Sequence, residues 1–89
     1  METMKDVVIA IEEVYVPAKR RKTLDATVVE ALAEDILENG QKEPILVRNA
    51  EERKDGARYV LVEGLHRLEA CRALGDGTIL ALIVHARRR

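Results

Sequence analysis

Residues 63–75, Glu-Gly-Leu-His-Arg-Leu-Glu-Ala-Cys-Arg-Ala-Leu-Gly, decide how this chain folds and what it can bind. They follow Tyr59-Val60-Leu61-Val62, an apolar run typical of a buried strand, and their own apolar spacing predicts a helix. Gly64 stands at the corner between the two, where the lack of a Cβ lets the backbone approach a ligand closely. The helix that begins there presents unpaired N–H groups and the positive end of its dipole.

Two cations in the first turn of this helix indicate what it binds. His66 and Arg67 lie where positive charge is unfavourable unless an anion lies beside it. Arg67 offers a fork of donors, and His66 adds a donor whose charge depends on its surroundings. The sequence therefore predicts an anion site, most plausibly for phosphate. A simpler alternative stays open, in which Gly64 is only a turn residue and the two cations pair with Glu63 or Glu69.

Composition limits the class of protein. The 89 residues predict one domain over 1–89, with 47% apolar residues available for its core. The net charge of −1 excludes a wholly basic nucleic-acid coat, and the scarcity of aromatic residues argues against binding single strands by base stacking. No apolar run approaches membrane-spanning length and residues 1–6 are not a signal peptide, so a cytoplasmic protein is expected.

Cys71 is the only cysteine of the chain, which excludes an internal disulfide and a thiolate zinc site. It falls in phase with Leu68 and Leu74 on the apolar side of its helix. A buried, inert thiol is therefore expected rather than a nucleophile, which needs an exposed, electropositive setting.

Six elements are predicted along the chain, in the order strand, helix, strand, strand, helix, strand. Their approximate ranges are 7–11 with a continuation toward Pro17, 25–38, 44–47, 58–63, the helix after Gly64, and 79–84. Asp55-Gly56 is the expected turn of a hairpin between the second and third strands. Because so short a chain buries one sheet face under two helices, the expected fold class is α+β with a small mixed sheet.

The helix over 25–38 has the clearest pattern. Asp25 is the expected N-cap, Thr27 with Glu30 offers a competing capping-box start, and Asn39-Gly40 supplies a left-handed stop. Its apolar stripe comprises Val29, Leu32, Ala33, Ile36 and Leu37.

Two charged segments could add to the anion site. Lys19-Arg20-Arg21-Lys22 is predicted to be a loop. It would supply further charge to the ligand, contact nucleic-acid backbone, or simply keep the chain soluble. Arg21 is the residue of this loop expected to point inward to the ligand. Glu63, at the strand end, would hold Mg²⁺ or act as a general base, or else pair with Arg67. Arg87-Arg88-Arg89 forms a short basic tail that is a weak DNA-binding signal.

With these residues in view, the chain resembles the ParB/sulfiredoxin superfamily, specifically the N-terminal domain of ParB-like proteins, from Val7 to about Val84. The matching pieces resemble the family's Pro-Arg segment, its Leu-Ala-x-Ser-Ile…Gly helix, its Gln-Pro-Ile-x-Val-Arg strand, and the Gly-Glu-Arg-Arg-x-x-Ala box that holds nucleotide phosphates. In chain order these pieces are Val16-Pro17 with Arg20-Arg21-Lys22-Thr23-Leu24-Asp25, Leu32-Ala33-Glu34-Asp35-Ile36 with Asn39-Gly40, Glu43-Pro44-Ile45-Leu46-Val47-Arg48, and Gly64-Leu65-His66-Arg67-Leu68-Glu69-Ala70.

The resemblance implies a nucleotide-binding module for ATP or CTP, with Mg²⁺ and NTP hydrolysis or phosphotransfer as its enzymatic form. The implied phosphate-binding residues are Gly64, Leu65, His66, Arg67 and Arg21. Glu63 matches the acidic residue that precedes Gly-x-His-Arg in the free serine kinases, which suits a catalytic or metal-binding role.

Departures from the family pattern narrow these functions. Sulfiredoxins carry their nucleophilic cysteine where this chain has Leu65, so sulfinic acid reduction is not expected. ParB proteins have Glu and Arg at the positions of Leu65 and His66, so their CTP chemistry does not follow automatically. Complete ParB proteins also continue into a helix-turn-helix domain and a dimerisation segment, and a complete partition clamp is therefore not expected.

Two other functions remain open. A DNA-associated accessory, acting in partition or transcription regulation, would use Lys19, Arg20 and Lys22 with Arg87, Arg88 and Arg89. A nuclease is less favoured, because it normally needs a cluster of acidic metal ligands and only Glu63 is clearly placed. The last alternative is an interaction domain whose helix corner binds nothing.

Overall fold

Strands and short helices alternate along the chain in the computed structural model, which describes residues 6–50 and 56–85. The elements are β1 (Asp6–Ala10), the 3₁₀ turn η1 (Ile11–Glu13), β2 (Val14–Tyr15), α1 (Ala18–Arg21), α2 (Ala26–Asn39), β3 (Ile45–Asn49), β4 (Tyr59–Glu63), α3 (Leu65–Ala73) and β5 (Thr78–Ile83).

The strands form one five-stranded sheet in the order β1-β5-β3-β4-β2. β1 pairs with β5 and β3 with β4 in antiparallel fashion, whereas β3 pairs with β5 and β2 with β4 in parallel. The expected hairpin of β3 and β4 is therefore present, although Asp55 of its turn lies outside the described residues. The α+β class with a mixed sheet is confirmed.

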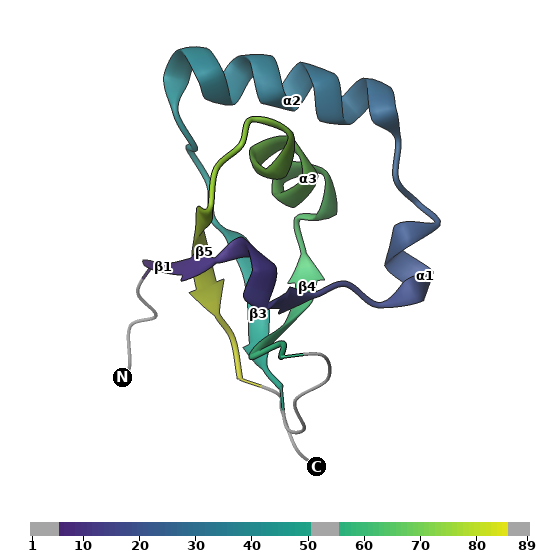
Figure 1. Ribbon diagram of the computed structural model, residues 1–89, viewed down its shortest axis with the longest axis vertical. Helices are drawn as coiled ribbons and strands as arrows, with labels where there is room; N and C mark the ends of the chain where they lie inside the picture. The colour runs from purple at the N-terminus through teal and green to yellow at the C-terminus, as the bar shows by residue number, and fades with distance from the viewer. Residues whose placement is uncertain (1–5, 51–55, 86–89) are drawn as a thin grey trace.

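The helices are stacked on the sheet rather than set side by side on it. α3 lies between the sheet and α2, and α2 crosses over α3 at one end of the molecule (Figure 1). Leu68 and Ala70 of α3 are fully buried, as is Val47 in the centre of the sheet. This packing fixes the start of α3 against the sheet, because the buried side chains of α3 would be exposed to water if the helix moved away.

The predicted ends of α2 are confirmed. The Asp25 carboxylate accepts a hydrogen bond from the Thr27 N–H at 2.9 Å, so Asp25 is the N-cap and the competing start at Thr27 is wrong. At the other end Gly40 has φ of 79° and its N–H donates to the Ile36 carbonyl at 2.7 Å. Leu37 departs from the predicted apolar stripe, because its side chain is 74% exposed.

The basic segment 19–22 differs from the sequence prediction. Most of it forms the single-turn helix α1 instead of a loop. Pro17, with φ of −58°, precedes the turn, and its carbonyl accepts hydrogen bonds from Arg20 N–H at 2.9 Å and Arg21 N–H at 3.3 Å. A four-residue helix is too short to show an apolar period, which is why the sequence pattern did not reveal it. The strand expected to continue past Ile11 is likewise interrupted by η1.

Candidate functional site

The corner between β4 and α3 depends on a glycine for two reasons. Gly64 has φ of 109° and ψ of 28°, a left-handed conformation that residues with a Cβ rarely adopt. A Cβ built on Gly64 would lie 2.7 Å from Ile45 Cγ2 and 2.9 Å from Ile45 Cβ. Ile45 is only 1% exposed and cannot move aside. The close approach at this corner is thus to the neighbouring strand β3, which the sequence did not indicate.

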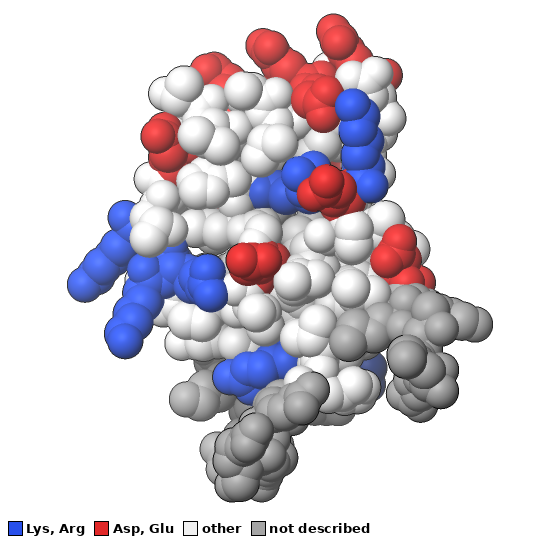
Figure 2. Space-filling view, turned by 180° about the vertical axis from the view of Figure 1, so that it is seen from behind, with Lys and Arg blue, Asp and Glu red and all other residues white. Residues whose placement is uncertain are grey.

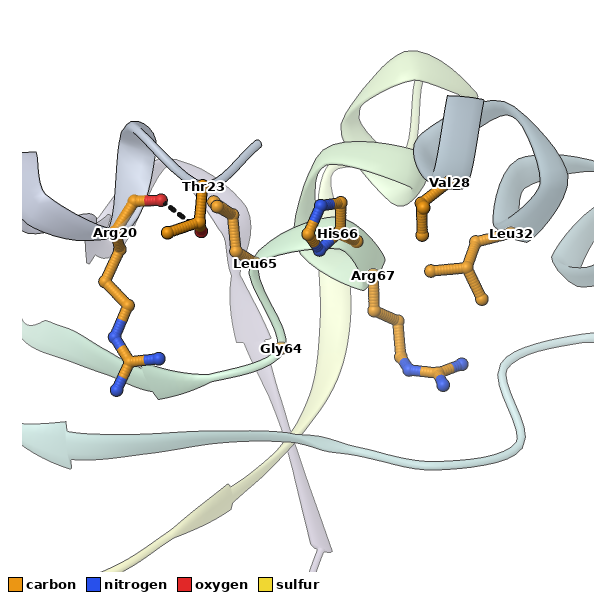
Figure 3. Close-up of a pocket in the computed structure, with 8 residues that line it drawn as sticks. All are labelled: Arg20, Thr23, Val28, Leu32, Gly64, Leu65, His66 and Arg67. Atoms are coloured by element: carbon orange, nitrogen blue, oxygen red, sulfur yellow. Dashed lines mark hydrogen bonds between the residues drawn. The ribbon is translucent and has the colours of Figure 1, made fainter. Parts of the chain in front are cut away.

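A pocket of about 380 Å³ opens at the start of α3. The first N–H groups of a helix have no acceptor within the helix, and no side chain caps α3. Its first residues line the pocket, so these N–H groups are available to a ligand there. The pocket wall comes from three separate segments of the chain, seen together in Figure 3. Its lining residues are Arg20, Thr23, Val28, Leu32, Gly64, Leu65, His66 and Arg67.

Arg67 is the less exposed of the two arginines at the pocket. Its side chain is 21% exposed, and its Nη2 lies 4.0 Å from Glu43 Oε1. Glu69 instead pairs with Arg72, at 3.4 Å, so neither of the partners expected for Arg67 is the one observed. Because Glu43 is 78% exposed and the separation is long, this ion pair is weak, at most about 1 kcal/mol. One sequence signal was available for the Arg67–Glu43 pair: Glu43 stands before Pro44 where the family strand has Gln.

His66 makes a tertiary contact that the sequence could not reveal. Its Nε2 accepts a hydrogen bond from the backbone N–H of Asp25 at 3.0 Å. An accepting Nε2 carries no proton, so the imidazole in this arrangement is neutral with its proton on Nδ1. The bond joins the first turn of α3 to the start of α2.

α1 brings Arg20 to the pocket. In Figure 3 the Arg20 and Arg67 side chains lie on opposite sides of the Gly64 corner. Arg21, the residue favoured from the sequence, is exposed and is not one of the lining residues. Consecutive helical residues point about 100° apart, so only one of the two can face a given wall. A phosphate contact from Arg21 stays a prediction.

Glu63 ends β4 next to the corner and is exposed. It does not line the pocket, and the structure gives it no test as a base or metal ligand. Within residues 6–50 and 56–85, no group of three or more His, Cys, Asp or Glu side chains is arranged to hold a metal ion. Both roles of Glu63 stay predictions.

Cys71 is buried in α3, as expected from its phase with Leu68. Burial raises the pKa of its thiol, and the nearby negative charge of Asp76 raises it further, with Arg67 opposing. The thiol is therefore held protonated and unreactive.

Charge is distributed unevenly over the surface. Figure 2 shows Lys and Arg side chains gathered over α1, and Asp and Glu side chains along α2. Lys19, Arg20, Arg21 and Lys22 are all exposed. The tail Arg87–Arg89 lies outside the described residues.

Comparisons with known proteins identify the family and the fold of this chain. The family model of the ParB N-terminal domain matches residues 2–89. The chain belongs to the ParB N-terminal domain family. Its fold is that of the ParB/sulfiredoxin superfamily, as the resemblance implied. No curated protein sequence matches the chain.

Solved structures show the same fold. The chain is 30% identical to sulfiredoxin from Arabidopsis thaliana, with a TM-score of 0.76, over 92% of this chain and 86% of that protein. It is 27% identical to the C-terminally truncated chromosome-partitioning protein ParB from Caulobacter crescentus, complexed with CTP-γ-S, with a TM-score of 0.77. A free serine kinase mutant in complex with ADP shares the fold at 21% identity and a TM-score of 0.75.

The chain covers these relatives unequally. It matches 46% of the ParB chain and 32% of the kinase chain. Among the described residues, the helices are all too short or too polar to cross a membrane.

Proposed function

We propose that this ParB-like domain binds a nucleoside triphosphate, ATP or CTP, with the phosphates at the start of α3. The observation that carries the proposal is a pocket in which an uncapped helix N-terminus is flanked by two arginine side chains, Arg20 on one side of the corner and Arg67 on the other. Helix N-termini bind phosphate because their free N–H groups and dipole favour negative charge. The ParB from Caulobacter crescentus, 27% identical, was solved with CTP-γ-S, which supports the same ligand class here.

Each part of the pocket has a distinct role in this proposal. The backbone N–H groups of Leu65, His66 and Arg67 donate to phosphate oxygens, and Gly64 provides the turn that presents them. Arg67 and Arg20 supply charge through bidentate hydrogen bonds. On the α2 side the wall is aliphatic, since Val28 and Leu32 line it. Once a ligand covers this wall, its aliphatic side chains would lower the local dielectric constant and strengthen the charged contacts.

Mg²⁺ fits this site only as a partner of the phosphates. It is commonly held by one or two carboxylates together with substrate phosphate oxygens, and Glu63 is the carboxylate next to the corner. When bound with the nucleotide, the ion would neutralise phosphate charge and favour hydrolysis or phosphotransfer. Glu63 would hold the ion or accept a proton from the attacking group.

The activity of sulfiredoxin is not extended to this chain. Leu65 occupies the position of the sulfiredoxin nucleophile and is buried at 6% exposure. Cys71 is also buried, and the raised pKa of its thiol disfavours the nucleophilic thiolate.

Isothermal titration calorimetry with ATP and CTP, with and without Mg²⁺, tests the proposal. Arg67→Ala should lower the affinity at least about tenfold, because it removes a half-buried, charge-assisted contact. Arg72→Ala is the matched control, since Arg72 lies on the same helix but outside the pocket. Absence of binding to the wild-type protein, or equal losses in both variants, would contradict the proposal.

DNA binding through α1 is a second candidate, favoured by the adjacent exposed cations Lys19, Arg20 and Arg21 of that turn and Lys22 directly after it. Figure 2 shows Lys and Arg side chains gathered over this part of the surface. Phosphate contacts of this kind are sequence-independent and weaken steeply with salt. Lys19→Ala combined with Lys22→Ala should then abolish a salt-dependent mobility shift of duplex DNA and leave nucleotide affinity unchanged. A mobility shift that persists in this variant would contradict DNA binding through α1.

A further inference from the structure

The bond between His66 and the start of α2 carries an inference that rests on the proposed nucleotide site. We propose that His66 is a positioning residue: its Nε2 holds the Asp25 N–H and thereby keeps the segment that carries Arg20 against the phosphate pocket. The hydrogen bond measures 3.0 Å and joins residues 41 positions apart.

The start of α2 needs this bond because its local cap is incomplete. In a capping box, a Glu or Gln at the third helical position returns to accept from the N–H of the N-cap residue. In α2 the third position is Val28, which cannot accept. Asp25 caps the helix with its carboxylate but has no local acceptor for its own N–H. His66 of α3 supplies the missing acceptor from across the pocket.

The effect extends from Asp25 to Arg20 through a short, bonded turn. The Thr23 hydroxyl donates to the Arg20 carbonyl at 2.7 Å, the bond dashed in Figure 3. The Thr23 N–H donates to the same carbonyl at 3.0 Å. The turn runs from Arg20 to Thr23, and one residue, Leu24, lies between Thr23 and Asp25. A tether at Asp25 therefore limits where the end of α1 can move. Holding this segment before the ligand arrives lowers the entropy lost on binding.

The bond also sets the protonation state in which His66 works. With Nε2 accepting, the ring is neutral and offers a phosphate oxygen only the Nδ1–H. Positive charge at the pocket then comes from Arg20 and Arg67. This division of roles separates a positioning His66 from a His66 that acts as a phosphate-binding cation.

Three substitutions distinguish the two roles by calorimetry with ATP and Mg²⁺. His66→Ala should weaken binding about fivefold, the equivalent of one neutral hydrogen bond. His66→Gln, which extends an acceptor to about the reach of Nε2, should recover most of that loss, whereas the shorter His66→Asn should not. Failure of Gln to do better than Asn would overturn the proposal.

A double-mutant cycle with Arg20 tests the positioning step itself. If His66 acts through Arg20, the loss caused by His66→Ala should largely disappear in an Arg20→Ala background. Fully additive losses would mean that His66 contributes independently, and would overturn the proposal.

A measurement on the ligand-free protein separates failure of this inference from failure of the proposed function. In the wild type, the Asp25 amide should resist hydrogen exchange and NMR should find the His66 proton on Nδ1. His66→Ala should accelerate exchange at Asp25, while His66→Gln should not. An unprotected Asp25 amide in the wild type would refute the tether even if nucleotide binds. A protected amide in a protein that binds no triphosphate would leave the tether intact, but refute its proposed role.

Discussion

Gly64 is the residue on which the geometry of the corner depends. Its φ of 109° and the 2.7 Å approach to Ile45 predict that Gly64→Ala lowers the free energy of unfolding by at least about 2 kcal/mol. Gly75→Ala is a matched control, because Gly75 has φ of 85° with nothing within 4 Å of a built Cβ. Urea unfolding of both variants checks this. Equal losses would show that the contact with Ile45 costs nothing.

Glu43 competes with a ligand for Arg67. Removing its charge by Glu43→Gln should raise triphosphate affinity by up to about threefold, since exposed ion pairs are worth less than about 1 kcal/mol. Calorimetry measures the change, and Glu69→Gln, which frees Arg72 instead, should have little effect. A weaker affinity for Glu43→Gln would indicate that this carboxylate assists binding.

The buried thiol of Cys71 predicts a dependence of stability on pH. Because burial raises its pKa above the ordinary 9.0, the unfolded thiol ionises at a lower pH than the native one. The free energy of unfolding should therefore decrease as pH rises above about 9.0, whereas Cys71 should cause no such change below that value. Urea unfolding of wild type and Cys71→Ala isolates the effect. Identical pH profiles for the two proteins would contradict it.

At the scale of elements, the ends of α2 could be foreseen from the sequence because capping is a local interaction. Asp25→Ala should lower the free energy of unfolding by about 1 kcal/mol, the usual cost of losing an N-cap. Thr27→Ala removes the competing cap and should change it by less than about 0.5 kcal/mol, since the exposed Thr27 side chain is not the observed cap. Thermal or urea unfolding distinguishes the two variants. A larger loss for Thr27→Ala would reverse the assignment.

Other elements were less visible in the sequence. The strands and the two longer helices carry enough apolar residues for their periods to be recognised. α1 does not, because its single turn is set by Pro17 and buries no residue. Leu37 fits the apolar stripe of α2 by spacing, yet its side chain is 74% exposed, whereas the neighbouring Ile36 is buried in the core.

At the scale of the whole molecule, topology assembles the pocket from segments that are distant in the sequence. Gly64, Leu65, His66 and Arg67 are contiguous, so the sequence could place them at one corner. The sequence could not show that three other features meet this corner, because each depends on how distant segments pack against the start of α3. These features are the Arg20 side chain, the ion pair with Glu43 and the hydrogen bond from Asp25 to His66. The chemistry of the corner could therefore be predicted from the sequence, but the assembly of the pocket wall from three segments could not.

The location of a bound triphosphate is the most direct test of this account. In amide NMR spectra recorded during titration with ATP or CTP and Mg²⁺, the largest shifts should occur at Leu65, His66 and Arg67, with smaller ones near Arg20. Amides at the far end of α3, around Ala73, should move little. Saturating shifts confined to other surfaces, or no shifts at all, would contradict the claim that the start of α3 binds phosphate.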